Sequence, residues 1–459
     1  MSDKRGPSGM SRRNFLRAAG AAYGLFCLPR FARPAAAAVP ADAVFPTIFI
    51  QLRGGWDPCY HFGARTGMPS RGVTADGIKQ TAAGVKWYQP TMTTMTPHMA
   101  DAVILNTKMS PSIDHHTGLV ELWYGRSSDA LARPPWTNVL ASALLDKAPA
   151  AAPNITTYWK REYSASDRDT DYVKYNNKSP NPLGAAQRVL DIKAFASSLD
   201  TSQGLPPSAE QKSVYQAIGK SDERLYDETL QPNTVAQFSQ ANAQANDLLG
   251  RTVKALWPPD TATKTLFNLD DAGLARTGYQ ATPQLAPMTA LAFQLARYQA
   301  SHVISMVAPD LYSYDNHGGG SPTTYQRTTG ARYFDSIARL LSALKATPSP
   351  IDPTVSMFET THVVIASEMG RSPTAENTNG TFHWDSTHVA CFGGRFKRGY
   401  NFGGLDSKLN AMPADFTTGA LNGGTTPTFM NVVATILAAN KVDPTKYSTA
   451  KAITAALKP

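Results

Sequence analysis

The chain has 459 residues, more than one hydrophobic core usually holds, so we expect one large domain with insertions or two lobes. Its net charge of +9 does not indicate nucleic-acid binding, because residues 1–38 hold seven basic and one acidic side chain and so carry six of the nine charges. Three cysteines without a CxxC pattern exclude a disulfide framework and disfavour haem and cysteine-zinc sites. Whether Cys59 and Cys391, the two beyond residue 38, form a disulfide is left open.

The N-terminal segment, residues 1–38, has the organisation of a secretory signal. Arg12 and Arg13 stand shortly before Phe15, a short apolar run follows, and alanines close the segment. Paired arginines in this position are typical of twin-arginine signals. We therefore expect export by the twin-arginine translocation machinery to the periplasm or the exterior, without a stable membrane anchor. The alternative is a basic N-terminal tail that is not a targeting signal.

Short apolar runs rich in β-branched residues recur along the rest of the chain. Such runs are typical of strands buried on both faces of a parallel sheet, and the amphipathic stretches between them predict helices. The alternation predicts an α/β fold with a mostly parallel, doubly wound sheet and helices on both faces. The predicted strands are Thr47–Leu52, Ala102–Asn106, Val303–Ala308, His362–Ala366 and Val389–Phe392, and the predicted helices are Met288–Ala300, Thr328–Ala346 and Thr428–Ala439.

The middle of the chain differs from its two flanks. It is polar, rich in Gln, Asn and Ala, and has few strand signals. We therefore predict a first part of the α/β core over residues 39–153, a mainly helical insertion or cap over 154–284, and a second part of the core over 285–459.

Clusters of polar side chains accompany the predicted strands. In open α/β sheets, sites form beyond the carboxyl ends of the strands, so clusters from distant parts of the chain can converge there. Asp, Glu and His without Cys suit zinc, manganese, magnesium or calcium. The five clusters are Arg53–Asp57, Ser110–Thr117, Asp310–Gly320, Ser367–Arg371 and Thr381–Asp385.

Asp315 and His317 lie two residues apart, so both side chains can reach one ion from an extended loop. The alternative is an ordinary turn, since Asp, Asn and Gly all favour turns. His383 by itself would more often be a packed histidine than a ligand. Convergence of the clusters favours the metal-binding interpretation for all three residues.

Five segments also resemble the signatures of one protein family: a Gly-Gly-x-Asp turn, a histidine seven residues before an aromatic residue, Asp-Thr-His, Ser-Glu-Phe-Gly-Arg-Thr-Pro, and Asp-His-Trp. The matching segments are, in that order, Gly54–Asp57, His116–Trp123, Asp315–His317, Ser367–Pro373 and Phe382–Trp384. Phe382 stands where the family has its aspartate. The chain thus resembles the bacterial DUF1501 proteins, twin-arginine-exported members of the alkaline phosphatase/sulfatase-like superfamily.

The resemblance implies an alkaline-phosphatase-like core that holds one or two divalent ions. By that resemblance Asp57 and Glu368 would bind one ion, and Asp315, His317 and His383 would bind the other. Two such ions could stabilise the attacking and leaving oxygens of a displacement at phosphorus or sulfur. Glu368 follows a serine where the superfamily usually pairs Asp with His, so one of these sites is a ligand short.

The resemblance also implies roles for three further residues. Arg371 would bind a tetrahedral oxyanion, with a structural ion pair to Glu368 as the alternative. His116 occupies the family's histidine position, with the hydroxyls of Thr117 and Ser112 nearby as alternative nucleophiles that would need a metal or a base. A Cys-x-Pro-x-Arg segment is absent from the sequence, which disfavours formylglycine-type sulfatase chemistry.

Taken together, the sequence predicts a periplasmic metal-dependent hydrolase, phosphatase- or phosphodiesterase-like, with a small-molecule or envelope ester as substrate. A non-catalytic periplasmic binding or assembly protein with a degenerate metal site is the alternative. A weaker third hypothesis is modification of carbohydrate or cell-envelope polymers through the helical insertion. His115 can be a third ligand or a residue that supports one, and both roles stay open.

Overall fold

The computed structural model describes residues 42–68, 71–109, 114–125, 133–148, 150, 152–157, 187–189, 259–269, 285–308, 314–317, 322–376 and 380–459. The predicted signal segment lies outside these residues. So does most of the predicted insertion, of which β5, β6 and α9 are described.

An eight-stranded sheet with the order β12-β4-β11-β8-β1-β7-β5-β6 forms the centre of the described chain. Strand β1 (Thr47–Gln51) pairs in parallel with β7 on one side and β8 on the other. Every residue of β1 is buried, and its alternating side chains supply two separate cores. The other strands of this sheet are β4 (Val103–Lys108), β5 (Asn154–Thr157), β6 (Gln187–Val189), β7 (Val303–Val307), β8 (His362–Ala366), β11 (Ser386–Phe392) and β12 (Tyr400–Phe402).

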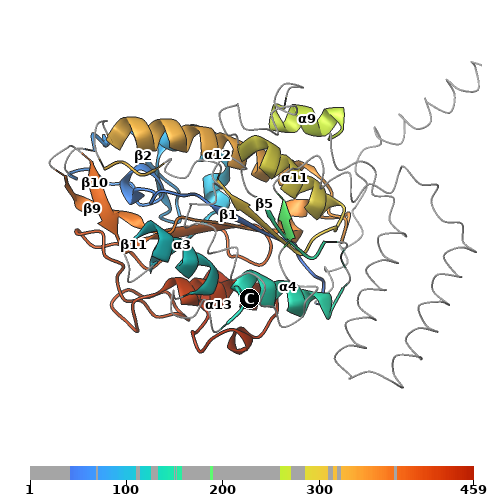
Figure 1. Cartoon of the computed structure of the whole chain (residues 1–459). Coiled ribbons are helices and arrows are strands. Elements are labelled where there is room, and N and C mark those ends of the chain that lie inside the picture. The colour runs from blue at the N-terminus through green and yellow to red at the C-terminus, as the bar shows by residue number, and fades with distance from the viewer. Residues whose placement is uncertain are drawn as a thin grey trace, which may run out of the picture. The chain divides into compact units, whose positions relative to one another are not determined.

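Helices cover both faces of this sheet (Figure 1). Ile48 and Ile50 of β1 pack in a core with α11 (Leu285–Arg297) and α12 (Pro322–Ala346). Phe49 belongs to the opposite core, whose helices are α3 (His115–Tyr124), α4 (Trp136–Leu145) and α13 (Phe429–Ala439). The predicted α/β fold with helices on both faces of a mostly parallel sheet is therefore confirmed.

The three predicted helices correspond to α11, α12 and α13, with α12 beginning at Pro322, six residues before the predicted start. Strand β11 departs from the expected direction, because it runs antiparallel to both β4 and β8. Like a parallel strand it is buried along its whole length, so its apolar run gives no sign of direction.

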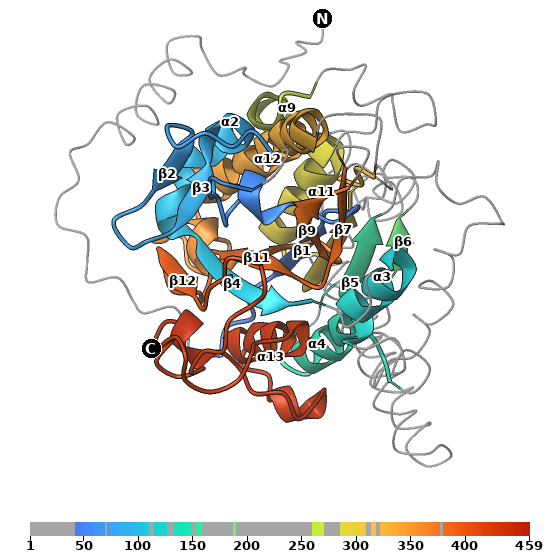
Figure 2. The same cartoon turned by 90° about the vertical axis from the view of Figure 1, so that its left-hand side faces the viewer.

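Two small two-stranded sheets flank the central one. In one of them, β9 pairs antiparallel with β10 next to the start of β11. Figure 2 looks toward this end of the molecule and shows β1, β7, β9 and β11 between α12 on one side and α13 on the other. The smaller elements are β2 (Ile78–Gln80), β3 (Lys86–Tyr88), α2 (Gln89–Met92), α9 (Thr261–Phe267), β9 (Gly370–Ala375), β10 (Thr381–Trp384), and the 3-10 turns Pro58–Tyr60, Thr93–Asp101, Met357–Thr360, Pro444–Lys446 and Thr454–Ala456.

Both described cysteines are buried and free. Cys59 belongs to a small apolar cluster beneath the loop around Leu409, whereas Cys391 lies on β11 in the core beneath α13. The question left open by the sequence is thereby answered, because the two thiols do not form a disulfide. Among the described residues no helix combines the length and the apolar character needed to cross a membrane.

Candidate metal centre

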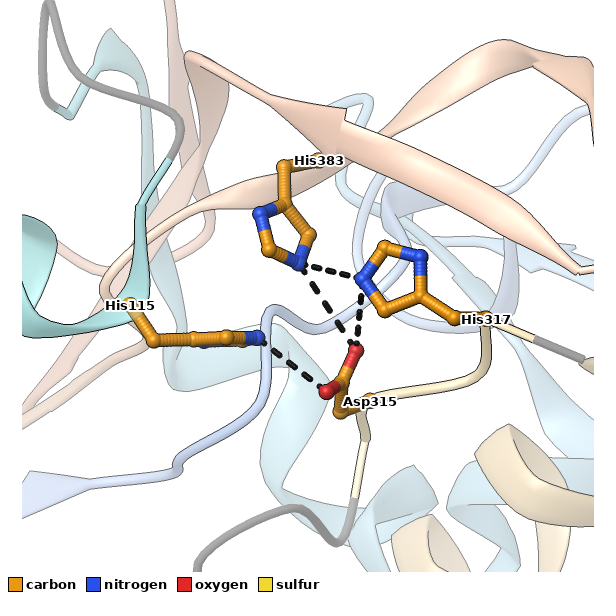
Figure 3. A group of neighbouring side chains, drawn as sticks. All are labelled: His115, Asp315, His317 and His383. Carbon is orange, nitrogen blue, oxygen red and sulfur yellow. Dashed lines mark hydrogen bonds and ion pairs between the residues drawn. The ribbon is translucent and has the colours of Figure 1, made fainter.

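Four side chains from three separate segments meet at the carboxyl edge of the sheet (Figure 3). His115 is the first residue of α3, Asp315 and His317 follow β7, and His383 lies on β10. One potential ligand atom from each lies within 4.8 Å of every other. The structure therefore brings together three of the five predicted ligands and adds His115.

Asp315 lies at the centre of this group, with each oxygen facing imidazole nitrogens. Its Oδ1 is 3.1 Å from Nε2 of His317 and 3.7 Å from Nε2 of His383, and its Oδ2 is 3.3 Å from Nε2 of His115. The two Nε2 atoms of His317 and His383 are only 2.6 Å apart. All three histidines thus turn the same ring nitrogen toward one point.

A carboxylate contacts the other ring nitrogen of two of these histidines. Nδ1 of His115 lies 2.7 Å from Oε1 of Glu368, and Nδ1 of His317 lies 2.7 Å from Oε1 of Glu376. Because an ionised carboxylate only accepts hydrogen bonds, these contacts place a proton on Nδ1, so that Nε2 is the nitrogen with which each ring would bind an ion. Metal-binding histidines in proteins have this arrangement.

The donor set fits a divalent ion. Nitrogen lone pairs that face one another at short range repel unless a proton or a cation lies between them, and three imidazoles with one carboxylate are good ligands for borderline metals. The His317 side chain is 45% exposed, whereas the other three are 13–17% exposed. The group is thus open to solvent at His317, where a small molecule could reach a bound ion.

Asp315 is held in place by Arg371, which is fully buried. The guanidinium donates to Oδ1 of Asp315 at 2.8 Å, to the carbonyl of Gly55 at 2.9 Å, to that of Thr381 at 3.1 Å and to that of Gly54. Burial alone would raise the pKa of Asp315, but His115, His383 and Arg371 hold this pKa far below its usual range. Arg371 thus donates its hydrogen bonds within the chain and stabilises the Asp315 carboxylate.

Glu368 is also buried, and it contacts the outer ring nitrogen of His115. Its carboxylate accepts from the backbone N–H of Gly54 at 2.7 Å and from Oγ of Ser367 at 3.0 Å, in addition to His115. Burial opposes ionisation, yet the contact with His115 lowers the pKa of Glu368. For His115 burial disfavours the charged ring, but hydrogen bonds to Asp315 and Glu368 outweigh it and, without an ion, raise its pKa to about 9. A bound ion would take the place of the proton on Nε2. Glu368 therefore positions His115.

Asp57 does not reach the group formed by the other ligands. Its Oδ2 accepts from Nε of Arg71 at 2.6 Å, and its Oδ1 accepts from the backbone N–H of Cys59 at 2.9 Å. Both members of the Asp57–Arg71 ion pair are fully buried. Arg71 also donates to the carbonyl of Ser372, so this pair joins the turn after β1 to β9.

Comparison with known proteins places the chain in a family. Residues 67–450 match the model of a family described as a protein of unknown function, DUF1501. The chain belongs to the DUF1501 family.

Two solved structures show a distant similarity to this DUF1501 protein. One is the phosphonate monoester hydrolase SpPMH from Silicibacter pomeroyi, at 10% identity over 89% of this chain and 75% of that one, with a TM-score of 0.37. The other is Ps i-CgsB in complex with k-i-k-neocarrahexaose, at 9% identity with the same coverage and TM-score. A search of the curated proteins found no match. Likeness at this level carries no argument about activity, which must come from the site itself.

In this DUF1501 protein the predicted nucleophile position lies in the first turn of α3. Asp114 caps the helix, accepting from the backbone N–H of Thr117 at 3.0 Å and from its hydroxyl at 3.1 Å. The backbone of His116 belongs to the same turn, but its side chain and Ser112 lie outside the described residues. A hydroxyl that donates to a carboxylate has the geometry of an alcohol next to a base, and also that of an ordinary helix cap.

Sequence reasoning did not single out two residues of the centre. It left the role of His115 open, although the residue directly follows a helix-capping aspartate and starts the helix at the strand edge. It passed over Glu376, which lies eight positions after Glu368 in the turn between β9 and β10. The β9–β10 pairing brings Glu376 next to His317, and no local sequence pattern predicts that contact.

Proposed function

We propose that this DUF1501 protein is a metal-dependent hydrolase of phosphate or related esters. The observation that supports this most is the convergence of three imidazole Nε2 atoms on the Asp315 carboxylate, with Glu368 and Glu376 behind two of them. Such an arrangement would bind one divalent ion on a side open to solvent. A second ion is not part of the proposal, because Asp57 is engaged by Arg71.

Zinc or manganese suits this donor set better than magnesium or calcium does. The harder ions prefer six or more oxygen ligands, whereas imidazole nitrogen suits zinc and the other transition ions. A bound ion would polarise an ester oxygen and make a bound water or alcohol easier to deprotonate. In this proposal Asp315 partly neutralises the ion and Arg371 keeps Asp315 ionised and in position.

The nucleophile would come from the start of α3 or from water. Thr117 lies two residues after His115, and its hydroxyl already donates to Asp114. We assign Thr117, or the neighbouring His116, to attack on the ester, with the carboxylate of Asp114 as the proton acceptor for Thr117. If Thr117 is the nucleophile, Thr117→Ser should preserve turnover and Thr117→Ala should abolish it, whereas equal activity of both variants would point to His116 or water.

Location is part of the same proposal. Export by the twin-arginine machinery after folding would allow the metal to be inserted in the cytoplasm and the loaded protein to act in the periplasm on a small-molecule or envelope ester. Replacing both Arg12 and Arg13 with Lys should retain the protein in the cytoplasm. Unchanged export of this variant, measured by cell fractionation, would contradict the proposed route.

Elemental analysis and activity measured on the same preparation test the function. Protein purified without chelator should contain about one divalent ion per chain and hydrolyse an aryl phosphate, an aryl phosphodiester or an aryl sulfate. His383→Ala should lose both the ion and the activity. His98→Ala is the matched control, because His98 contacts the hydroxyl of Ser342 and is not one of the four residues of the centre. The proposal would be refuted if the wild-type protein, purified without chelator, contains no metal and hydrolyses none of the three esters.

One observation favours the non-catalytic alternative, a binding or assembly protein with a degenerate metal site. Arg371 is buried and donates to three backbone carbonyls and to Asp315, so its guanidinium is engaged within the chain instead of being available to an oxyanion. In that case the purified protein would contain the ion, and His383→Ala would lose it together with thermal stability, yet no ester would be turned over.

A further inference from the structure

A group of buried polar atoms lies where α12 packs against α2 and the turn after β1. His61, Thr91 and Tyr314 are each at most 1% exposed. No described residue provides a hydrogen-bond partner for Nε2 of His61, Oγ1 of Thr91 or the hydroxyl of Tyr314. Burial of polar atoms without partners is strongly unfavourable, and nearly all such atoms in native proteins are paired with protein groups or with water.

Gly330, in the interior of α12, faces this group. A Cβ atom on Gly330 would lie 3.2 Å from Nε2 of His61 and 3.6 Å from the hydroxyl oxygen of Tyr314, and it would collide with the methyl group of Thr91. Nε2 of His61 and the hydroxyl of Tyr314 therefore lie beside the place where any other residue would have a side chain, and the methyl group of Thr91 occupies part of that place. Glycine inside a helix is less stable than alanine, and the glycine here allows the close approach of Thr91 on α2 to α12.

The hydrogen-bonding roles at this place can be assigned. Nδ1 of His61 lies 2.7 Å from the carbonyl oxygen of Asp57, which only accepts, so Nδ1 carries the proton and Nε2 is an acceptor. Burial lowers the pKa of His61 to about 4, which keeps the ring neutral. The hydroxyls of Thr91 and Tyr314 can each donate or accept. A small molecule that donates to His61 and exchanges hydrogen bonds with both hydroxyls would satisfy all three groups.

We propose that Gly330, His61, Thr91 and Tyr314 form a binding site for an internal water molecule, which we call the Gly330 site. Water is the smallest molecule with two donors and two acceptors, and a buried water usually makes about three hydrogen bonds. The imidazole of His61 and the ring of Tyr314 lie edge to face, 5.3 Å apart, and form two of its walls.

This water would join two segments that carry the metal centre. His61 is bonded to the carbonyl of Asp57 in the turn after β1, and Tyr314 directly precedes the ligand Asp315. Gly54 of the same turn lies against the backbone of Tyr314 and Asp315, so the two segments already touch there. The water would be a second link between them, and its presence depends neither on metal binding nor on hydrolysis.

The direction of a stability change tests the proposal. Tyr314→Phe removes only the hydroxyl. If that hydroxyl bonds to a water, the variant should lose about 1–3 °C in Tm. If the hydroxyl is buried dry, its removal relieves an unsatisfied group and Tm should rise, which would overturn the proposal.

A second pair of variants tests the space in front of Gly330. Thr91→Ser removes the colliding methyl group and keeps the hydroxyl, so Gly330→Ala can be introduced in that background without the clash. At a dry site the methyl group added by Gly330→Ala should raise Tm above that of Thr91→Ser alone through helix propensity, which would overturn the proposal. At a hydrated site it should lower Tm by displacing the water.

Oxygen-17 relaxation dispersion of the solvent, which counts long-lived internal waters, gives a readout that stability alone does not. The count should fall by about one in Tyr314→Phe and in the double variant, in line with a single bound water. Tyr447→Phe is the control, because that hydroxyl donates to the carbonyl of Trp123, and its removal should leave the count unchanged. An unchanged count in all three variants would also overturn the proposal.

Discussion

Glu376 offers the sharpest test of the proposed metal centre, because it contacts the proposed ligand His317 and was not predicted from the sequence. Its Oε1 is 2.7 Å from Nδ1 of His317, and its side chain is 10% exposed. Glu376→Gln keeps the size and one acceptor oxygen but removes the negative charge that makes the ring a stronger donor. Changes of this kind lower metal affinity about 10- to 100-fold. This corresponds to about 1.4–2.7 kcal/mol of binding free energy.

The assay is a competition titration of the metal-free protein with zinc against a chromogenic chelator. Glu359→Gln is the matched control, since Glu359 is a partly exposed glutamate in ion pairs with Arg398 and Lys458. The affinity of this variant for zinc should equal that of the wild type. Glu376→Gln should show weakened binding with little change in the Tm of the metal-free protein. If Glu376→Gln binds zinc within twofold of the wild-type affinity, in the same experiment where Asp315→Asn abolishes binding, the role of Glu376 in supporting His317 is refuted.

Three further outcomes follow from buried groups outside the centre. Asp57→Asn leaves its arginine partner as an unpaired buried charge and should cost about 3–5 kcal/mol of unfolding free energy in urea while the metal content is retained; Asp335→Asn, in an exposed ion pair, should cost less than about 0.5 kcal/mol. Burial and nearby positive charge lower the pKa of His362 to about 3, below the value of about 6.5 in the unfolded chain. Its contribution to stability is therefore complete above about pH 6.5 and is lost as the pH falls toward 3, and His362→Gln should flatten the urea midpoint over that range. Cys59 and Cys391 should resist a thiol reagent in the native protein and react after unfolding, whereas rapid labelling of either would contradict their burial.

The sequence predicted the elements of the fold well wherever burial alone decides them. Strand β8 has the bounds that its apolar run predicts, and β1, β4 and β7 differ by one or two residues at their ends. A continuous apolar run reports that both faces of a strand are covered, and that information is local. The partners of a strand depend on residues far along the chain, which is why pairing could be predicted only as mostly parallel.

Within the site, the sequence predicted best where a general rule of sheet geometry applies. The rule that sites form beyond the carboxyl ends of strands brings Asp315, His317 and Glu368 to one place. It could not tell that Asp57, beyond the end of β1, is engaged by a partner instead. That partner is Arg71, fourteen residues away in a stretch with no motif, and only the folded chain brings the two together.

The third imidazole of the centre depends on the one strand whose direction was unexpected. Ser386, the first residue of β11, pairs with Lys108, the last residue of β4, because the two strands run in opposite directions. The segment just before β11, with His383 on β10, therefore lies at the carboxyl edge of β4, where α3 starts and His115 stands. A parallel strand in this position would begin at the opposite edge and would place the residues before it away from Asp315. The antiparallel strand in a mostly parallel sheet is thus what allows a ligand that precedes a strand to join ligands that follow strands.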